Sequence, residues 1–151
     1  MKKFVFPLRS VETVRAMREL RAREIFTEAL HAFIAAESAL ERAREQRRKL
    51  EEILVASRGA TLRPADQVSY LDAYHDELAR ERQAAVERIA AKAELDLRRD
   101  AWVAARRDLR VIENLEVKAR EAYRREVEYE EQKLLDDRTN ATAGRTALLT
   151  S

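Results

Sequence analysis

Two acid-x-x-His patterns are the first residues in the sequence that could do chemistry. Glu28 precedes His31 by three residues, and Asp72 precedes His75 by three. On a helix this spacing puts a carboxylate and an imidazole on one face, and di-iron helical bundles use such a pair on each of two helices. The helical register derived below places His31 near residue 92, so the two patterns lie roughly 25 Å apart. We therefore expect ordinary surface histidines and no metal site.

Other catalytic arrangements are missing from the sequence. The two glycines, Gly59 and Gly144, are isolated, so there is no glycine-rich loop that could hold the phosphates of a nucleotide. The absence of cysteine excludes disulfides and thiolate metal ligands. The sequence therefore predicts a protein that is not an enzyme and has no cofactor.

Two basic segments, residues 42–49 and 98–110, raise the possibility of a nucleic-acid partner. Glutamates flank the first segment, and Trp102 in the second is spaced from Ala105 and Leu109 as in a helical seam. The net charge is only +2, whereas a surface that follows a phosphate backbone normally has a larger uncompensated charge. We expect Trp102 to lie in a helix–helix seam and the protein to bind no nucleic acid.

The elements that carry these residues are predicted to be long helices. Charged residues make up 38% of the chain, and only two glycines and two prolines interrupt it, a composition typical of coiled coils. In the first half an apolar row follows the heptad steps of four and three, with Arg47 as its one exception. The row consists of Ala22, Phe26, Ala29, Phe33, Ala36, Leu40, Ala43, Arg47, Leu50 and Leu54. Upstream, steps of three (Val11, Val14, Met17, Leu20) predict that the row drifts around the helix.

The segment "SRGATLRPADQ" (57–67) interrupts the helical pattern and predicts a turn. Gly59 suits a left-handed position that ends a helix, Thr61 suits an N-cap, and Pro64 suits the first turn of the next helix. The second helix is expected to place its own apolar residues in the seam. They are Val68, Leu71, Leu78, Val86, Ile89, Leu97, Trp102, Ala105, Leu109, Ile112, Leu115, Ala119 and Ala122.

These patterns predict an all-α fold made of two long helices in an antiparallel coiled-coil hairpin, the second longer than the first. The expected single domain spans residues 1–151, with a helix at about 8–57, a turn at about 58–65, a helix at about 66–138 and a flexible tail at 139–151. In this hairpin residue i faces roughly residue 123 − i. The first helix is then too short to cover the second beyond residue 114, which leaves most of residues 115–138 with only a short N-terminal leader beside it.

The two ends of the chain carry opposite charges. Residues 1–23 hold seven Lys/Arg and two Glu, whereas residues 114–137 hold five basic and eight acidic residues. This opposition suits a hairpin that brings the ends together.

Near the turn, four large side chains fall within three helical turns, at Tyr70, Leu71, Tyr74 and Leu78. They form either a hydrophobic cap on the end of the hairpin or an anchor for a partner protein.

The sequence also bears on location. No apolar run approaches the ~20 residues that a membrane span needs, and the charges near the N-terminus leave no apolar core for a signal peptide. We expect a cytoplasmic protein without direct membrane insertion.

The two ends of the chain resemble the FliJ family of flagellar export proteins. Members commonly begin with Phe-x-Phe-x-Leu followed by a valine and an arginine-rich helix, and these positions are Phe4, Phe6, Leu8, Val11 and Arg15 here. A late Gln-Lys-x-x-Asp stretch is matched by Gln132, Lys133, Asp136 and Asp137. Length, helical layout and turn position are also similar. The YscO-type stalk proteins of virulence type III secretion share the layout, but the N-terminal motif favours the flagellar family.

The resemblance implies a non-enzymatic coiled-coil stalk of the flagellar type III export apparatus, peripherally associated with the inner membrane at the flagellar base. Its expected partners are the hexameric export ATPase, the cytoplasmic domain of the export gate and export chaperones. The residues expected to contact the ATPase ring are Phe4, Phe6, Leu8, Arg15, Glu126, Glu130, Glu131, Gln132, Lys133, Leu134 and Asp136. The expected gate patch is Tyr70, Leu71, Tyr74 and Leu78. The competing expectations are a virulence-type secretion stalk and a purely structural, self-associating coiled coil.

Overall fold

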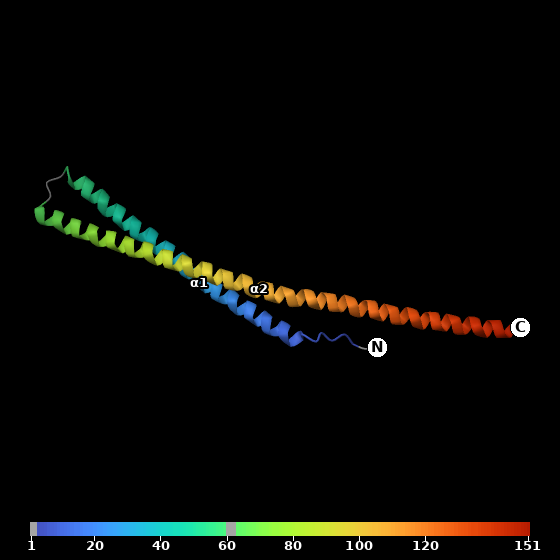
Figure 1. Cartoon of the computed structure of the whole chain (residues 1–151). Coiled ribbons are helices and arrows are strands. Elements are labelled where there is room, and N and C mark those ends of the chain that lie inside the picture. Colours follow the sequence, from blue (N-terminus) through green and yellow to red (C-terminus); the bar gives the residue numbers. More distant parts are fainter. Residues whose placement is uncertain (1–2, 60–62) are drawn as a thin grey trace. The chain divides into compact units, whose positions relative to one another are not determined.

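The computed structural model describes residues 3–59 and 63–151. Helix α1 spans Arg9–Ser57 and helix α2 spans Pro64–Leu149, of 49 and 86 residues (Figure 1). The described residues form no strand. The prediction of two helices that pack against each other, the second longer, is therefore confirmed. Contacts divide the chain into a terminal unit, Met1–Met17 with Arg106–Ser151, and a turn unit, Arg18–Ala105.

In the turn unit, the two helices run in opposite directions. Phe26 of α1 stacks on Trp102 of α2 with ring centroids 5.2 Å apart, and further along Glu37 pairs with Arg88. Every position of the predicted α1 row from Ala22 to Leu54 is buried or half-buried, including Arg47, and Ala29 and Leu40 are the most deeply buried. The heptad pattern of α1 was thus read correctly from the sequence.

The α2 side of the turn unit differs from the prediction. Val86, Ile89 and Leu97 are 59–67% exposed, so their expected placement in the seam is wrong. The inward positions are instead taken by Ala84 and Leu95, which are 9% and 7% exposed. Ala84 and Leu95 are in phase with the α1 row, whereas Val86, Ile89 and Leu97 are not.

The ends of the helices at the turn match the predicted boundaries. The amides of Arg58 and Gly59 bond to the carbonyls of Val55 and Ala56, so α1 ends in a tightened i→i−3 turn. No described glycine has a positive φ, so the left-handed conformation expected at Gly59 is wrong. Pro64 is the first residue of α2, so it lies in the first turn as expected, although the helix begins slightly before the expected start at about residue 66. The N-cap predicted at Thr61 lies outside the described residues.

In the terminal unit, polar and apolar side chains share the seam. Ile112 of α2 is 3% exposed. Further along the same face of the helix, Glu116, Ala119 and Tyr123 are half-buried. Leu115 and Ala122, expected in the seam, are exposed. On α1 the seam positions are Glu12 and Arg15. The heptad phase of the helix continues through them, whereas Val11, Val14 and Met17, spaced by three, leave the seam as their drift predicted.

Helix α2 continues beyond its predicted end near residue 138, and the tail expected at 139–151 is helical as far as Leu149. Good helix formers, the alanines at 141, 143 and 147, lie in this stretch. The hydroxyls of Thr139, Thr142 and Thr146 donate to the carbonyls four residues earlier, at 2.8–2.9 Å. The threonines therefore satisfy their hydroxyl groups within the helix and do not end it.

Candidate partner-binding surfaces

The N-terminal Phe-x-Phe motif attaches the leader, residues 3–8, to α2. The Phe4 ring packs against Tyr123 with centroids 5.4 Å apart, and the Arg120 guanidinium lies 5.4 Å from the same ring. Phe6 is only 5% exposed. The structure thus gives both phenylalanines an intramolecular contact, and Leu8, at 38% exposed, is the more accessible apolar residue of the motif.

A polar layer of Arg9, Glu12, Glu116 and Arg120 lies directly beside this aromatic contact. Arg9 donates to Glu116 at 2.6 Å and to Glu12 at 3.2 Å, and Arg120 donates to Glu116 at 2.9 Å. Burial and a hydrogen bond with Glu116 raise the pKa of Glu12, whereas the hydrogen bonds from Arg120 and Arg9 lower the pKa of Glu116. The layer fixes the register of α1 on α2, because a slip by one turn would leave partly buried charges unpaired.

Arg15 makes one further contact across the two helices of the terminal unit. Its Nη1 donates to the backbone carbonyl of Asp108 at 2.8 Å. Of the four predicted ring-contacting residues at the N-terminal end, Phe4, Phe6 and Arg15 thus hold the unit together.

The C-terminal part of the terminal unit has a different character. Val127 is the last half-buried residue of α2, and every residue from 128 to 151 is exposed. Tyr129, Leu134 and Leu135 are 60–71% exposed. The remaining predicted ring-contacting residues all lie on α2 at or just before this exposed end, and all are exposed: Glu126, Glu130, Glu131, Gln132, Lys133, Leu134 and Asp136.

The predicted gate patch partly coincides with a cavity near the turn. The cavity has a volume of about 390 Å³ and receives Leu71 and Tyr74 from the start of α2. Tyr70 and Leu78 are half-buried but do not line it. The sequence did not indicate the α1 side of the cavity. That side consists of Glu51, Leu54, Val55 and Ser57, with Arg58 just beyond the helix. Leu54 was the last member of the heptad row, and this position was the available signal.

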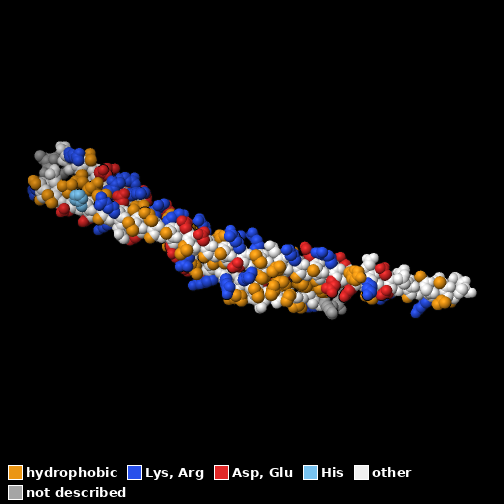
Figure 2. Space-filling model, in the orientation of Figure 1, with side chains coloured by type: hydrophobic (Ala, Val, Ile, Leu, Met, Phe, Trp, Pro, Cys, Tyr) orange, Lys and Arg blue, Asp and Glu red, His pale blue; other side chains and the backbone are white. Residues whose placement is uncertain are grey.

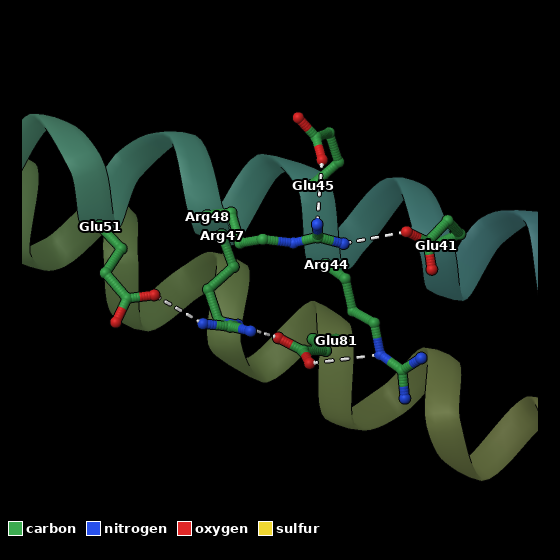
Figure 3. Close-up of polar contacts among 7 residues, drawn as sticks. All are labelled: Glu41, Arg44, Glu45, Arg47, Arg48, Glu51 and Glu81. Atoms are coloured by element: carbon green, nitrogen blue, oxygen red, sulfur yellow. Dashed lines mark hydrogen bonds and ion pairs between the residues drawn. The ribbon is translucent and has the colours of Figure 1, made fainter.

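A second polar layer lies near the cavity, at the one polar position of the α1 heptad row. The Glu81 carboxylate accepts a hydrogen bond from Arg47 and pairs with Arg44 at 3.7 Å (Figure 3). Arg47 also donates to Glu51, a cavity residue, at 2.8 Å. The hydrogen bond to Glu81 raises the pKa of Arg47. Arg47 therefore occupies a seam position as an ion-paired cation. Its hydrogen bond to Glu51 connects the seam to the cavity wall.

The residues first considered for chemistry do not converge. His31 and His75 are both exposed, and among residues 3–59 and 63–151 no group of three or more His, Asp or Glu could hold a metal ion. Trp102 lies in the seam as predicted, stacked on Phe26, and its indole N–H donates to Glu19 at 2.9 Å. No helix in the described part of the chain is apolar enough to cross a membrane.

Comparison with known families now identifies the chain's relatives. The model of the flagellar FliJ protein family matches residues 3–147, nearly the whole chain. The chain belongs to the FliJ family. No curated protein and no solved structure matches it.

Membership of the FliJ family makes the chain a component of the flagellar export apparatus. The family match over residues 3–147 spans the leader, both helices and most of the exposed end of α2. Members of this family are non-enzymatic export components.

Proposed function

We propose that this FliJ-family chain is a stalk of the flagellar export machinery that joins the export ATPase ring to the export gate. The observation that supports the proposal is the exposed end of α2. From residue 128 to Leu149 the helix continues with exposed apolar and acidic side chains, beyond the contact of Phe4 with Tyr123. An ordered helix end with this surface is suited to a partner that surrounds it.

The terminal unit provides a fixed base for that helix end. The aromatic contact of Phe4 with Tyr123 and the polar layer around Glu116 hold α1 in register on α2. In the proposal, the ATPase ring contacts Leu8 and the exposed residues Glu126–Asp136, while Phe4, Phe6 and Arg15 act indirectly by positioning them.

Truncation after Val127 tests the ring contact. The truncated chain keeps Tyr123, Glu116 and the seam, so its helical circular dichroism per residue and its unfolding midpoint should stay close to those of the full chain. Co-sedimentation with the purified hexameric ATPase should be lost. Full retention of ATPase binding by a folded truncation would contradict the proposal.

The gate contact is proposed at the cavity near the turn. Leu71 is 45% exposed and lines the cavity, and Tyr74 lies one turn away on the same wall. An apolar side chain of the gate's cytoplasmic domain is expected to enter between them. Leu71→Ala should weaken binding of that purified domain, whereas Val68→Ala, at a 57% exposed position outside the lining, should not. Equal binding of both variants would remove the cavity from the gate interface.

The wider setting follows from the family. We place the protein in the cytoplasm, at the flagellar base and peripheral to the inner membrane. The proposal also includes binding of export chaperones, which we assign to no particular residue.

The alternative of a self-associating coiled coil predicts a dimer at micromolar concentration. Sedimentation-equilibrium measurement of a monomer excludes that alternative and leaves the exposed helix end free for another protein.

A further inference from the structure

In the terminal unit, four branched apolar side chains lie on one flank of the helix pair, outside its seam. Val11 and Val14 of α1 are 36% and 48% exposed, and Val111 and Leu115 of α2 are 54% and 42% exposed. The seam positions next to them hold Glu12 and Glu116. The unit thus places ion-paired side chains in its seam beside Ile112, and branched apolar side chains at surface positions where a two-helix coiled coil normally carries polar residues.

The two apolar pairs belong to the same flank. Arg15 crosses to the Asp108 carbonyl on one side of the seam. Val11 lies one turn before Arg15, and Val111 lies one turn after Asp108, so in an antiparallel pair they flank this crossing together. Leu115 is one turn beyond Val111, level with the start of α1. Figure 2 shows hydrophobic side chains gathered where the start of α1 lies against α2.

The charges bordering this flank are mainly positive. Arg107 precedes Val111 by four residues and Lys118 follows Leu115 by three, so both lie on the outer edge of the α2 row. Arg15 adds a third cation, whose guanidinium donates to the neutral backbone carbonyl of Asp108. Asp108 is the acidic side chain within the row. An apolar strip with a cationic border favours a partner with apolar and anionic groups.

We propose that this flank is a docking groove for a third helix: an acidic amphipathic helix of another protein, which forms a three-helix coiled coil with α1 and α2. Leucine-like side chains at heptad spacing fit between the rows of Val11–Val14 and Val111–Leu115, and glutamates beside them meet Arg107 and Lys118. The groove goes beyond the proposed stalk function, because it needs neither the exposed end of α2 nor the cavity near the turn.

A designed peptide tests the groove without knowledge of the natural partner. The probe is a fluorescent synthetic helix with leucines at heptad spacing and flanking glutamates, and the comparison peptide has lysines in place of the glutamates. Fluorescence anisotropy with the full chain should show saturable binding of the acidic peptide, weakened by salt, and much weaker binding of the basic one. Equal affinity for both peptides, or no binding of the acidic one, would overturn the proposal.

Two valines of α2 provide matched variants for the same titration. Val111 in the groove and Val117 are 54% and 55% exposed, but six residues place Val117 about 240° further round the helix, on the other flank. Val111→Glu should weaken the acidic peptide roughly tenfold or more, as expected for a charge placed in an apolar contact. Val117→Glu should leave affinity unchanged, with equal helicity in both variants. Equal weakening by both would locate the peptide elsewhere.

A second copy of this chain is the alternative to another protein as the molecule that binds in the groove. Sedimentation of the full chain alone should give a monomer whether or not Val111 is replaced. A dimer that dissociates on Val111→Glu but not on Val117→Glu would show that the groove binds another copy of this chain, and would overturn the proposed partner.

Discussion

The turn unit and the terminal unit differ in whether the apolar row of α1 lies in the seam between the helices. In the turn unit the apolar row of α1 coincides with the seam, and Phe26, Leu40 and their neighbours are covered by α2. In the terminal unit the seam holds Glu12 and Glu116, while Val11 and Leu115 remain at the surface. The difference indicates that burial of the α1 row stabilises the turn unit, whereas the terminal unit leaves Val11 and Leu115 at the surface where the proposed third helix would bind.

The largest expected effect is on stability in the turn unit. Leu40 is 5% exposed, so Leu40→Ala should lower the free energy of unfolding by about 2–4 kcal/mol through lost burial and a cavity. Val14→Ala on the terminal flank should change it by no more than about 0.5 kcal/mol. Urea denaturation followed by circular dichroism measures both. Similar losses would mean that the two units do not differ as described.

The second effect concerns the attachment of the leader. Phe6→Ala removes a ring that is 5% exposed and should cost the terminal unit roughly 1–3 kcal/mol of local stability. Amide hydrogen exchange should then accelerate in the first turns of α1 and stay unchanged around Phe26. Val5→Ala, at a neighbouring position that is 75% exposed, is the control and should leave exchange unaltered. Unaltered exchange in the Phe6 variant would show that the leader contact is not stabilising.

A third, smaller effect tests whether the ion pair between Arg47 and Glu81 stabilises the hairpin. Both side chains are partly buried, at 23% and 18% exposed. Glu81→Ala should cost about 1 kcal/mol because it leaves Arg47 with only Glu51. The double change Arg47→Leu with Glu81→Leu should be neutral or stabilising, since it completes the apolar row. A double variant less stable than Glu81→Ala would show that the ion pair itself stabilises the hairpin.

The smallest expected effect is a pH dependence of the terminal unit. The pKa of Glu12 is higher in the folded chain than in the unfolded chain. Protonation of Glu12 therefore stabilises the folded chain as the pH falls through its folded-state pKa toward its unfolded-state pKa. The pKa of Glu116 is lower in the folded chain than in the unfolded chain. The ionised Glu116 therefore stabilises the folded chain above its unfolded-state pKa, and this stabilisation is lost as the pH falls through its folded-state pKa. Carboxyl NMR titration should therefore show Glu12 taking up its proton before Glu116.

Glu12→Gln is the matched variant for this pH dependence. Thermal melts from neutral to acidic pH should lose the early stabilising step in Glu12→Gln and keep the later loss due to Glu116. Protonation of Glu116 at higher pH than Glu12 in the unmodified chain would contradict the hydrogen bonding described for the polar layer.

The sequence predicted the fold where apolar side chains and heptad phase coincide. In α1 the row from Ala22 to Leu54 determined the seam, including the polar Arg47, because its heptad spacing keeps every member on the face turned to α2. It did not predict α2 equally well, since Val86 and Leu97 are apolar yet lie out of phase with α1. Periodicity within one helix does not specify which of two apolar rows the partner helix covers.

The candidate surfaces were predicted to different extents. The Phe-x-Phe motif, the exposed acidic end and the Leu71–Tyr74 pair could be found from the sequence. The polar layer could not, because it depends on the contact of Arg9 with Glu116, which are 107 residues apart in the chain. The helical continuation to Leu149 was also missed, since threonine hydroxyls that bond within the helix cannot be distinguished by type from those that end it.

Site-specific photo-crosslinking to the purified ATPase hexamer tests the central claim most directly. A photoreactive amino acid is placed at Leu134 on the exposed end of α2 or at Leu97 in the turn unit, positions that are 60% and 59% exposed. The stalk proposal predicts a crosslink to the ATPase from position 134 and none from position 97. Crosslinks of equal yield from both positions, or from position 97 alone, would contradict it.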